Sequence, residues 1–421
     1  MRCVTNHQTT VHCRVTLPLS KSILNRLLVI RHLSGNHGMD GIFSEASDVL
    51  TMQNLLLQIR RNKGKTKIDV EINTGNAGTV MRFLTSVLAL TPGRWMLTGD
   101  ERMQKRPILP LTDALQSLGA EIVFENIHGF PPLAITGNSN LTGGTISPDA
   151  GISSQYISSL MMIGPLLKGG LAIELQGNII SGSYICMTQS LMQKAGADVD
   201  FDGKTLQIKE GKYNSSDFFA LAEPDWSAAA FWYQVAAFAP QAEILLQGLY
   251  GKSIQGDSVL PAIYANLGVS SVFTNEGVVL AKSGSNAVTE FNYDFTECPD
   301  LAQPVIVSCA ALGIKGRFKG IKTLRVKETD RITALKNELT QLGYGITVVG
   351  DEILLDGKIH SVQKKKIPEI VNCYDDHRMA MSFAPLALLL GSICIDDMDV
   401  VKKSYPRYWK DMEMAGFSLR E

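Results

Sequence analysis

A recurring order of apolar and polar positions runs through this chain. Leu and Ala residues at helical spacing lead to a glycine, and a short alternating stretch of β-branched or apolar residues follows it, as in a strand. Each glycine stands where a helix is expected to end in the left-handed conformation, which glycine adopts at almost no cost. The five clearest copies are centred on Gly119, Gly196, Gly268, Gly343 and Gly416.

The spacing of these copies predicts the fold class. The five glycines follow one another at intervals of about 75 residues, a longer period than that of ordinary solenoid repeats. A weaker copy around Gly64 lies upstream at a shorter interval. One helix–glycine–strand segment is common in any α/β protein, but a regular series indicates a repeated unit. We predict an α/β protein of about six units, arranged as two closed domains of three.

Two prolines indicate where the domains divide. Pro224 separates the third unit from an apolar helical stretch, and the strand-like segment before Pro18 has no helix of its own. A chain of 421 residues is also too long for one small core. We therefore expect residues 18–223 to form one domain and residues 1–17 with 224–421 to form the other.

The charge balance excludes one class of protein. Lys and Arg number 40 and Asp and Glu number 41, so the chain lacks the positive field typical of a nucleic-acid binder. Apolar residues make up 45% of the chain and charged residues only 19%, which allows large buried cores. A strong anion site must therefore be local, built from a few converging cations.

Cysteine usage and the absence of targeting segments indicate the compartment. The seven cysteines are scattered and never form C-x-x-C, which favours free thiols over a disulfide or zinc framework. The sequence shows neither an apolar leader nor an unbroken apolar stretch of about 20 residues. We expect a soluble cytoplasmic protein that binds neither membrane nor nucleic acid. Because dinucleotide, zinc-protease and serine-hydrolase motifs are missing, the sequence shows no binding site for a common cofactor.

Polar and basic residues gather at the predicted strand-to-helix junctions. Lys21, Ser22 and Arg26 begin an apolar helix, where cations, a hydroxyl and free backbone N–H groups suit a phosphate. Glycines in the turn at residues 74–79 would let backbone N–H groups approach an anion closely. Each cluster alone is equally consistent with a capped surface helix or a tight turn. Carboxylates among the later clusters, such as Asp300, weaken anion binding and so point to proton transfer.

The motifs taken together resemble one family. SKSxxNR, GNAGTxMR, RMxxRP, SSQ, SxxY, SIQGD, PD, RVKETDR, DDHRMAM and KxYP occur in this order between residues 20 and 406. The chain is thereby similar to the 3-phosphoshikimate 1-carboxyvinyltransferases, or 5-enolpyruvylshikimate-3-phosphate synthases, of the enolpyruvyl transferase superfamily. That resemblance implies an inside-out α/β barrel of two domains, each with three β-α-β-α-β-β repeats, and an active site at the inter-domain cleft.

The resemblance also implies a reaction. Such enzymes transfer the carboxyvinyl group of phosphoenolpyruvate to the 5-hydroxyl of shikimate 3-phosphate through a tetrahedral intermediate, on the shikimate pathway to chorismate. A monomer without a cofactor is implied. The residues implied for shikimate 3-phosphate are Lys21, Ser22, Arg26, Ser153, Ser154, Gln155, Ser181, Tyr184, Asp300 and Lys327. Those implied for phosphoenolpyruvate are Lys21, Asn76, Gly78, Arg106, Gln155, Arg331, Arg378 and Lys403.

The same resemblance suggests catalytic roles. Asp300 is assigned as the base for the 5-hydroxyl, and Glu328 and Lys21 as the leading proton-transfer groups, with Lys403 as a further catalytic cation. The chain departs from the family pattern at two places: Phe83 stands where the family usually has Pro, and Thr323 stands where Asn is common. Because Gly78 leaves room beside the phosphoenolpyruvate site, inhibition by glyphosate is expected.

Two alternatives remain at this point. UDP-N-acetylglucosamine 1-carboxyvinyltransferases share the fold and the donor, but typically carry a reactive cysteine before an Arg-Pro pair, and the loop DERMQKRP has none. A non-catalytic anion-binding protein with the same fold would be expected to lose its acid and base residues. The candidate groups are nevertheless all present in this chain: Asp300, Glu328, Lys21 and Lys403.

Overall fold

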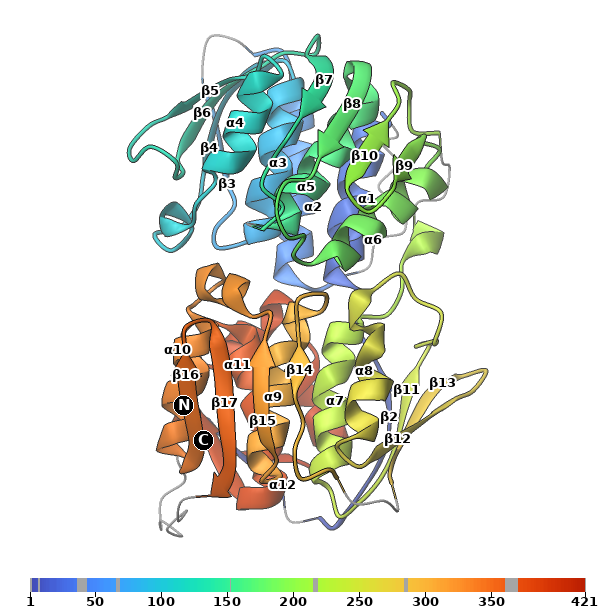
Figure 1. Cartoon of the computed structure of the whole chain (residues 1–421), viewed down its shortest axis with the longest axis vertical. Coiled ribbons are helices and arrows are strands. Elements are labelled where there is room, and N and C mark those ends of the chain that lie inside the picture. Colours follow the sequence, from blue (N-terminus) through green and yellow to red (C-terminus); the bar gives the residue numbers. More distant parts are fainter. Residues whose placement is uncertain are drawn as a thin grey trace. The chain divides into compact units, whose positions relative to one another are not determined.

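The structure, a computed structural model of the whole chain, describes residues 2–6, 8–35, 44–65, 69–151, 153–214, 219–283, 287–359 and 370–420. The chain divides into two compact units (Figure 1). Unit 1 consists of Met1–Ser20 with Glu223–Glu421, and unit 2 consists of Lys21–Ala222. The division falls beside Pro18 and Pro224, from which the sequence predicts two domains.

The described residues of unit 2 form two four-stranded sheets of one topology. In each sheet a parallel pair is followed by two antiparallel strands, in the orders β3-β4-β6-β5 and β7-β8-β10-β9. The strands are β3 (Val70–Asn73), β4 (Gly93–Thr98), β5 (Glu121–Phe124), β6 (Leu133–Gly137), β7 (Thr142–Ile146), β8 (Lys168–Glu174), β9 (Val199–Phe201) and β10 (Thr205–Ile208). The α-helices are α1 (Lys21–Leu33), α2 (Ser47–Asn62), α3 (Gly78–Leu90), α4 (Leu109–Ser117), α5 (Ser154–Ile163) and α6 (Gly182–Lys194).

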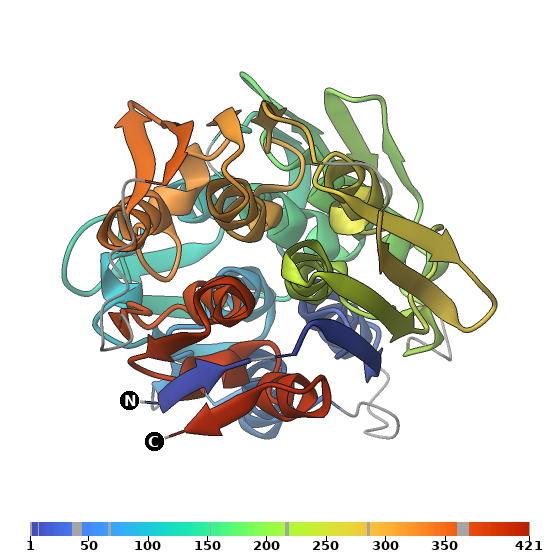
Figure 2. The same cartoon turned by 90° about the horizontal axis from the view of Figure 1, so that it is seen from below.

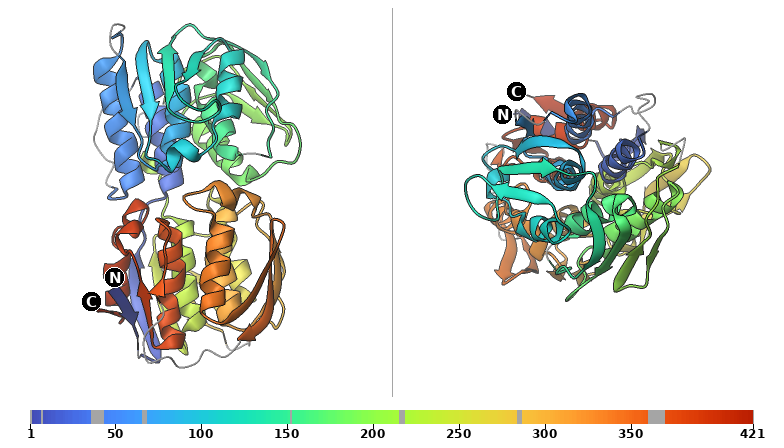
Figure 3. Two further views of the ribbon diagram at one scale, coloured as in Figure 1. Left: turned by 90° about the vertical axis from the view of Figure 1, so that its left-hand side faces the viewer. Right: turned by 90° about the horizontal axis from the view of Figure 1, so that it is seen from above.

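The core of unit 2 is helical. The helices α1, α3 and α5 pack against one another, and 12 of the 13 residues of α3 are buried. A helix that is apolar on all sides has to be enclosed by other elements. The buried helices α1, α3 and α5 accordingly lie together, and strands of the two sheets run along the outside of the unit (Figure 3).

Unit 1 repeats this topology in three sheets, ordered β12-β13-β11-β2, β14-β15-β17-β16 and β18-β19-β1-β20. The strands are β1 (Arg2–Thr5), β2 (Thr10–Thr16), β11 (Gln241–Gln247), β12 (Val269–Phe273), β13 (Gly277–Lys282), β14 (Tyr293–Asp294), β15 (Lys315–Lys319), β16 (Tyr344–Val349), β17 (Glu352–Ile359), β18 (Ile370–Val371), β19 (Ser392–Ile395) and β20 (Ser418–Arg420). The α-helices are α7 (Trp226–Phe238), α8 (Leu260–Ala265), α9 (Ala302–Ala311), α10 (Arg331–Gln341), α11 (His377–Phe383), α12 (Ala387–Leu390) and α13 (Tyr408–Met414). The buried helices α7, α9 and α11 pack together, and the three sheets surround them (Figure 2).

The N-terminal segment completes two sheets of unit 1. Strand β2 pairs in parallel with β11, and β1 lies between β19 and β20, antiparallel to both. Cys3 of β1 and Cys394 of β19 face each other with their Cα atoms 3.9 Å apart, and they form a disulfide. The expectation of free thiols is therefore wrong for this pair, because a separation of 391 residues along the chain hides that the strands are neighbours. Four further cysteines of the described chain are free: Cys13, Cys298, Cys309 and Cys373.

The glycine pattern is confirmed. Gly343 has φ 85° between α10 and β16, and Gly119 has φ 91° between α4 and β5. The same helix–glycine–strand order with a positive φ occurs at Gly64, Gly196, Gly268 and Gly416. The predicted α/β class is confirmed, and unit 1 shows all three predicted repeats. Within the described residues, unit 2 shows two complete repeats, and residues 36–43 between α1 and α2 lie outside these residues. None of the helices in the described ranges has the length and hydropathy that crossing a lipid bilayer requires.

Candidate active site

In unit 2, one buried arginine ties three helices together. The Arg26 guanidinium donates from Nε to Thr188 Oγ1 at 2.7 Å and from Nη2 to Ser158 Oγ at 3.0 Å. Its Nη1 donates to the backbone carbonyl of Ser22 at 2.9 Å. Arg26, Ser158 and Thr188 stand in the second turn of α1, α5 and α6 respectively. These three helices therefore begin at the same end of unit 2.

The helix α3 begins there too. Gln155, at the start of α5, donates from Nε2 to Thr79 Oγ1 at the start of α3, at 3.1 Å. One turn later, Ser159 donates to the backbone carbonyl of Arg82 at 2.7 Å, so the two helices run in parallel. Four helix N-termini, each with a partial positive charge, thus gather at one end of the unit and favour an anion.

The electrostatics of Arg26 are unusual for a buried cation. The residue is 2% exposed, and within the described part of the chain no carboxylate lies at ion-pair distance from it. Its guanidinium carbon lies 5.3 Å from the ring centre of Phe83 and 5.7 Å from that of Tyr184. Burial lowers the pKa of Arg26 to about 10, which leaves it charged at neutral pH. Phe83, the departure from the family pattern, therefore provides a ring that the Arg26 cation can contact.

Two further cations belong to this end of unit 2. Lys21 Nζ lies 2.9 Å from Asp48 Oδ2, and both side chains are largely buried. The Arg106 guanidinium packs against Gly78: a Cβ placed on that glycine would lie 2.5 Å from Nη2. Arg106 Nη1 also reaches the backbone carbonyl of Asn76 at 3.5 Å. The predicted turn at residues 74–79 thus lies directly beside Arg106, a cation predicted to bind phosphoenolpyruvate.

The predicted hydroxyls of unit 2 lie at helix starts. Ser153 caps α5 and accepts from the backbone N–H of Gln155 at 3.3 Å, and Ser154 is buried behind it. Ser181 precedes α6 in the left-handed conformation with φ 59°, and Tyr184 lies in the first turn.

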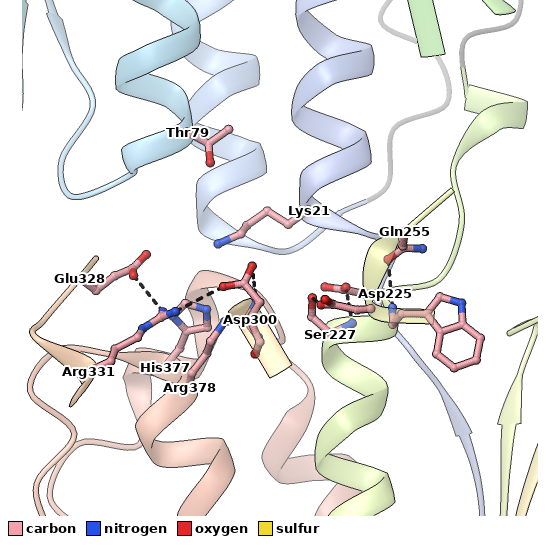
Figure 4. A network of polar contacts seen from close by, with 12 residues as sticks. Lys21, Thr79, Asp225, Ser227, Gln255, Asp300, Glu328, Arg331, His377 and Arg378 are labelled. Atoms are coloured by element: carbon pink, nitrogen blue, oxygen red, sulfur yellow. Dashed lines mark hydrogen bonds and ion pairs between the residues drawn. The ribbon is translucent and has the colours of Figure 1, made fainter. Parts of the chain in front are cut away.

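In unit 1, Arg331 is the centre of a carboxylate cluster (Figure 4). It is 1% exposed and donates to Asp376 through Nε at 2.6 Å and through Nη2 at 3.2 Å. Its Nη2 also lies 2.9 Å from Glu328 Oε2, and its Nη1 lies 3.4 Å from Asp300 Oδ1. Burial by itself lowers the pKa of Arg331, but the three carboxylates together raise it well above the usual value.

Arg378 and Lys403 join the same cluster. Arg378 Nη2 lies 3.3 Å from Asp300 Oδ2, while its Nη1 donates to the Asp300 backbone carbonyl at 3.0 Å. Lys403 Nζ lies 3.7 Å from Glu328 Oε1. Both predicted proton-transfer carboxylates of this unit therefore contact two cations each. Lys327, one of the residues predicted to bind shikimate 3-phosphate, is half-buried and directly precedes Glu328 in the chain.

A second buried acid lies close to Asp300. Asp257 is 3% exposed; its Oδ2 accepts from Ser227 Oγ at 2.5 Å, and its Oδ1 has no hydrogen-bond partner among the described residues. Burial, and after it the charge of Asp300, raises the pKa of Asp257 to about 7. Asp257 belongs to the motif SIQGD, but the sequence predicts no role for it.

The turn before α11 is strained. Tyr374 and Asp375 are consecutive non-glycine residues with φ of 54° and 56°, and such conformations cost about 1–3 kcal/mol each. The turn leads into Asp376, which caps α11 by accepting from the Arg378 backbone N–H at 2.9 Å.

Several partners of the predicted residues were missed by sequence reasoning: Asp48, Thr79, Ser158, Thr188, Asp257 and Asp376. Of these, Asp376 had a visible signal, because it lies two residues before Arg378 and just before an apolar helix. Thr323, the second departure from the family pattern, has a buried hydroxyl with no hydrogen-bond partner among the described residues. In the described ranges no three His, Cys, Asp or Glu side chains form a group that could hold a metal ion.

Each of the two α/β units gathers buried cations at helix starts, and carboxylates contact these cations in both units. This combination defines a class of enzyme that acts on anionic substrates. Comparison with known proteins gives the family. Residues 6–412 match EPSP synthase (3-phosphoshikimate 1-carboxyvinyltransferase), and the chain belongs to this family.

Individual relatives agree over the full length. The chain is 43% identical to a 3-phosphoshikimate 1-carboxyvinyltransferase of Bacteroides fragilis, with 100% of this chain and 99% of that protein covered. It is 33% identical to the protein of the same name from Methanospirillum hungatei, with 94% of each covered. Its fold is similar to that of EPSP synthase from Acinetobacter baumannii, with a TM-score of 0.75, 22% identity and complete coverage of both chains.

Proposed function

We propose that this chain transfers the enolpyruvyl group of phosphoenolpyruvate to the 5-hydroxyl of shikimate 3-phosphate, releasing phosphate, on the shikimate pathway. Family membership over residues 6–412 supports this reaction. The observation that carries the proposal is that Asp300 and Glu328 both contact Arg331. Two carboxylates that could transfer protons therefore lie beside a cation that could bind an anionic substrate.

The end of unit 2 where α1, α3, α5 and α6 begin is suited to bind phosphate and carboxylate groups. Four helix starts with Lys21 and Arg106 offer backbone N–H donors and positive charge. The residues proposed for shikimate 3-phosphate are Lys21, Ser22, Arg26, Ser153, Ser154, Gln155, Ser181, Tyr184, Asp300 and Lys327. Those proposed for phosphoenolpyruvate are Lys21, Asn76, Gly78, Arg106, Gln155, Arg331, Arg378 and Lys403.

The proposed chemistry is addition followed by elimination. As the 5-hydroxyl oxygen bonds to C2 of phosphoenolpyruvate, Asp300 takes the hydroxyl proton and C3 receives a proton, which gives the tetrahedral intermediate. In the second step C3 loses a proton and the C2–O bond to phosphate breaks. Glu328, held between Arg331 and Lys403, and Lys21 are the groups proposed for the transfers at C3 and at the departing phosphate. Arg331 and Arg378 would stabilise charge that develops on the intermediate.

We further propose that the chain acts as a cytoplasmic monomer, that it needs no metal or organic cofactor, and that glyphosate inhibits it in competition with phosphoenolpyruvate. The last point rests on Gly78, whose lack of a side chain lets the Arg106 guanidinium lie directly against its backbone.

Release of phosphate tests the proposal. The purified chain is mixed with phosphoenolpyruvate and either shikimate 3-phosphate or UDP-N-acetylglucosamine, and free phosphate is measured over time. Release with the first acceptor alone is expected. Release with the nucleotide sugar alone would identify the other carboxyvinyl transfer, and release with neither would support a non-catalytic anion-binding protein.

A further inference from the structure

The strained turn at Tyr374 and Asp375 connects β18 to α11 in unit 1. Both residues have positive φ without being glycine, and both side chains are exposed. Such a pair persists only where surrounding contacts hold the backbone in place, and conformations of this kind concentrate at functional sites. The contacts of this turn therefore show which residues keep it in this conformation and which side chain it positions.

One buried carboxylate holds the turn from α10. Glu338 is 1% exposed, and its Oε1 accepts from the Tyr374 hydroxyl at 2.6 Å. Its Oε2 accepts from the Asn372 backbone N–H at 3.1 Å, and the Asn372 amide donates to Oε1 at 3.3 Å. Burial, and after it the hydrogen bond to Glu338, raises the pKa of Tyr374, which keeps its hydroxyl available as a donor. On the other side, the Cys373 backbone N–H donates to Asp396 at 2.8 Å.

The turn positions the Asp376 carboxylate against the Arg331 guanidinium. Asp376 directly follows the strained pair and accepts the two hydrogen bonds from Arg331. Arg331 and Glu338 lie seven residues apart on α10, and therefore on the same face of that helix. The helix thus binds the segment at both ends, through Glu338 before the strained pair and through Arg331 after it.

We propose that Glu338 is a positioning residue for the phosphoenolpyruvate site: it keeps Tyr374 and Asp375 left-handed, so that Asp376 stays in register with Arg331. This inference rests on the proposed function, in which Arg331 binds phosphoenolpyruvate. Glu338 itself contacts neither Arg331 nor the other predicted site residues in the hydrogen bonds that the structure gives it. Its effect is therefore expected to pass through the backbone of the turn.

Four variants test the proposal in the full chain. Glu338→Gln keeps the shape of the side chain but places an amide N–H against a donor of Asn372. Tyr374→Phe removes one of the three hydrogen bonds and leaves the carboxylate unchanged. Asp375→Gly permits a positive φ without restraint, and Asp375 is exposed, with no hydrogen bond or ion pair in the described structure. The double variant Glu338→Gln/Asp375→Gly tests whether the turn still needs the Glu338 hydrogen bonds when glycine removes the backbone strain. Glu352→Gln, in a surface ion pair of the same unit, is the matched control.

Steady-state kinetics give the first readout. Glu338→Gln is expected to raise the KM for phosphoenolpyruvate by about 10- to 100-fold, since displacing a positioned charge by a fraction of an ångström has effects of this order. The KM for shikimate 3-phosphate should stay within about twofold, because the turn reaches only Arg331 and Arg378. Tyr374→Phe should act in the same direction but less. Asp375→Gly and Glu352→Gln alone should match the wild type, and Asp375→Gly should recover most of the loss in the double variant.

Hydrogen exchange gives a second readout that needs no activity. Amides of residues 373–378 should exchange faster in Glu338→Gln and regain protection in the double variant. Unchanged exchange in Glu338→Gln, equal rises in both KM values, or failure of Asp375→Gly to rescue would each overturn the proposal. If the wild type releases no phosphate, the proposed function fails, and the exchange experiment still decides whether Glu338 holds the turn.

Discussion

Asp376 accepts the Arg331 guanidinium along one edge, with Nε at 2.6 Å from Oδ2 and Nη2 at 3.2 Å from Oδ1. This edge-on pairing leaves Nη1, with the remaining proton of Nη2, directed toward Asp300 and Glu328. One fully buried carboxylate thus fixes the guanidinium plane, while the two proposed proton-transfer groups share its other edge. The arrangement separates the residue that orients the arginine from those proposed to act on substrate.

Replacing Asp376 by Asn should destabilise unit 1. Arg331 would keep its charge but lose its most buried partner, and breaking a buried ion pair from one side costs about 3 kcal/mol or more in the free energy of unfolding. Urea unfolding followed by Trp fluorescence measures this, since Trp226, Trp232 and Trp409 all lie in unit 1. Glu352→Gln, which breaks an exposed pair with Arg317, should leave the unfolding midpoint unchanged. Equal midpoints in both variants would contradict the assigned role of Asp376.

Asp257 should make the stability of unit 1 depend on pH. Its pKa is raised to about 7, first by burial and then by Asp300, so the folded chain binds this proton more tightly than the unfolded chain does. Stability from this group is present at low pH and is lost as the pH rises toward 7. Relative to Asp257→Asn, the wild type should lose about 2 kcal/mol of unfolding free energy between pH 5 and pH 8. Chemical denaturation of both proteins across this range measures the difference; a constant difference would show that Asp257 does not titrate there.

A methyl group at Gly78 should displace Arg106. The added Cβ would lie 2.5 Å from Nη2 and 2.8 Å from the guanidinium carbon, so the guanidinium has to move while the backbone can stay. Gly78→Ala is expected to raise the KM for phosphoenolpyruvate by about tenfold or more without changing the melting temperature. Gly144→Ala, where the new Cβ has no neighbour within 4 Å, serves as the control. A normal KM in Gly78→Ala would argue against phosphoenolpyruvate binding at Arg106.

Asp300→Asn tests the proposed base. The amide cannot take the hydroxyl proton, and its single oxygen can accept from Arg331 or from Arg378 but not from both, while the backbone carbonyl keeps its hydrogen bond from Arg378. Turnover at saturating substrates should fall by about 10²- to 10⁴-fold, the usual contribution of a positioned proton-transfer group. Single-turnover phosphate release separates this loss from weaker binding. Near-normal turnover would remove Asp300 from that role.

Regular features of the fold were readable from the sequence. A left-handed helix end is nearly specific for glycine, so Gly343 and its counterparts reveal the repeats directly. Cations at helix starts, such as Lys21 and Arg331, are visible for a similar reason, because helix boundaries can be read locally. The structure places these residues at the helix starts expected of them.

Features that depend on distant contacts were not readable. Nothing in the sequence near Asp257 reveals that it is buried close to Asp300, and burial is what shifts its pKa. The left-handed pair at Tyr374 and Asp375 has no glycine to mark it, because contacts with Glu338 hold it instead. The pairing of Cys3 with Cys394 likewise depends on which strand the N-terminus joins.

The position of β1 between β19 and β20 sets an order of events during synthesis. All of unit 2 leaves the ribosome before most of unit 1 is made, so it can fold while translation continues. The first strands, β1 and β2, have to wait unpaired until their partners emerge, which for β1 means nearly the last residues of the chain. A nascent chain stalled shortly before β20 would therefore contain all of unit 2, while β1 in unit 1 would still lack one of its two neighbouring strands and leave an open sheet edge for chaperones or proteases.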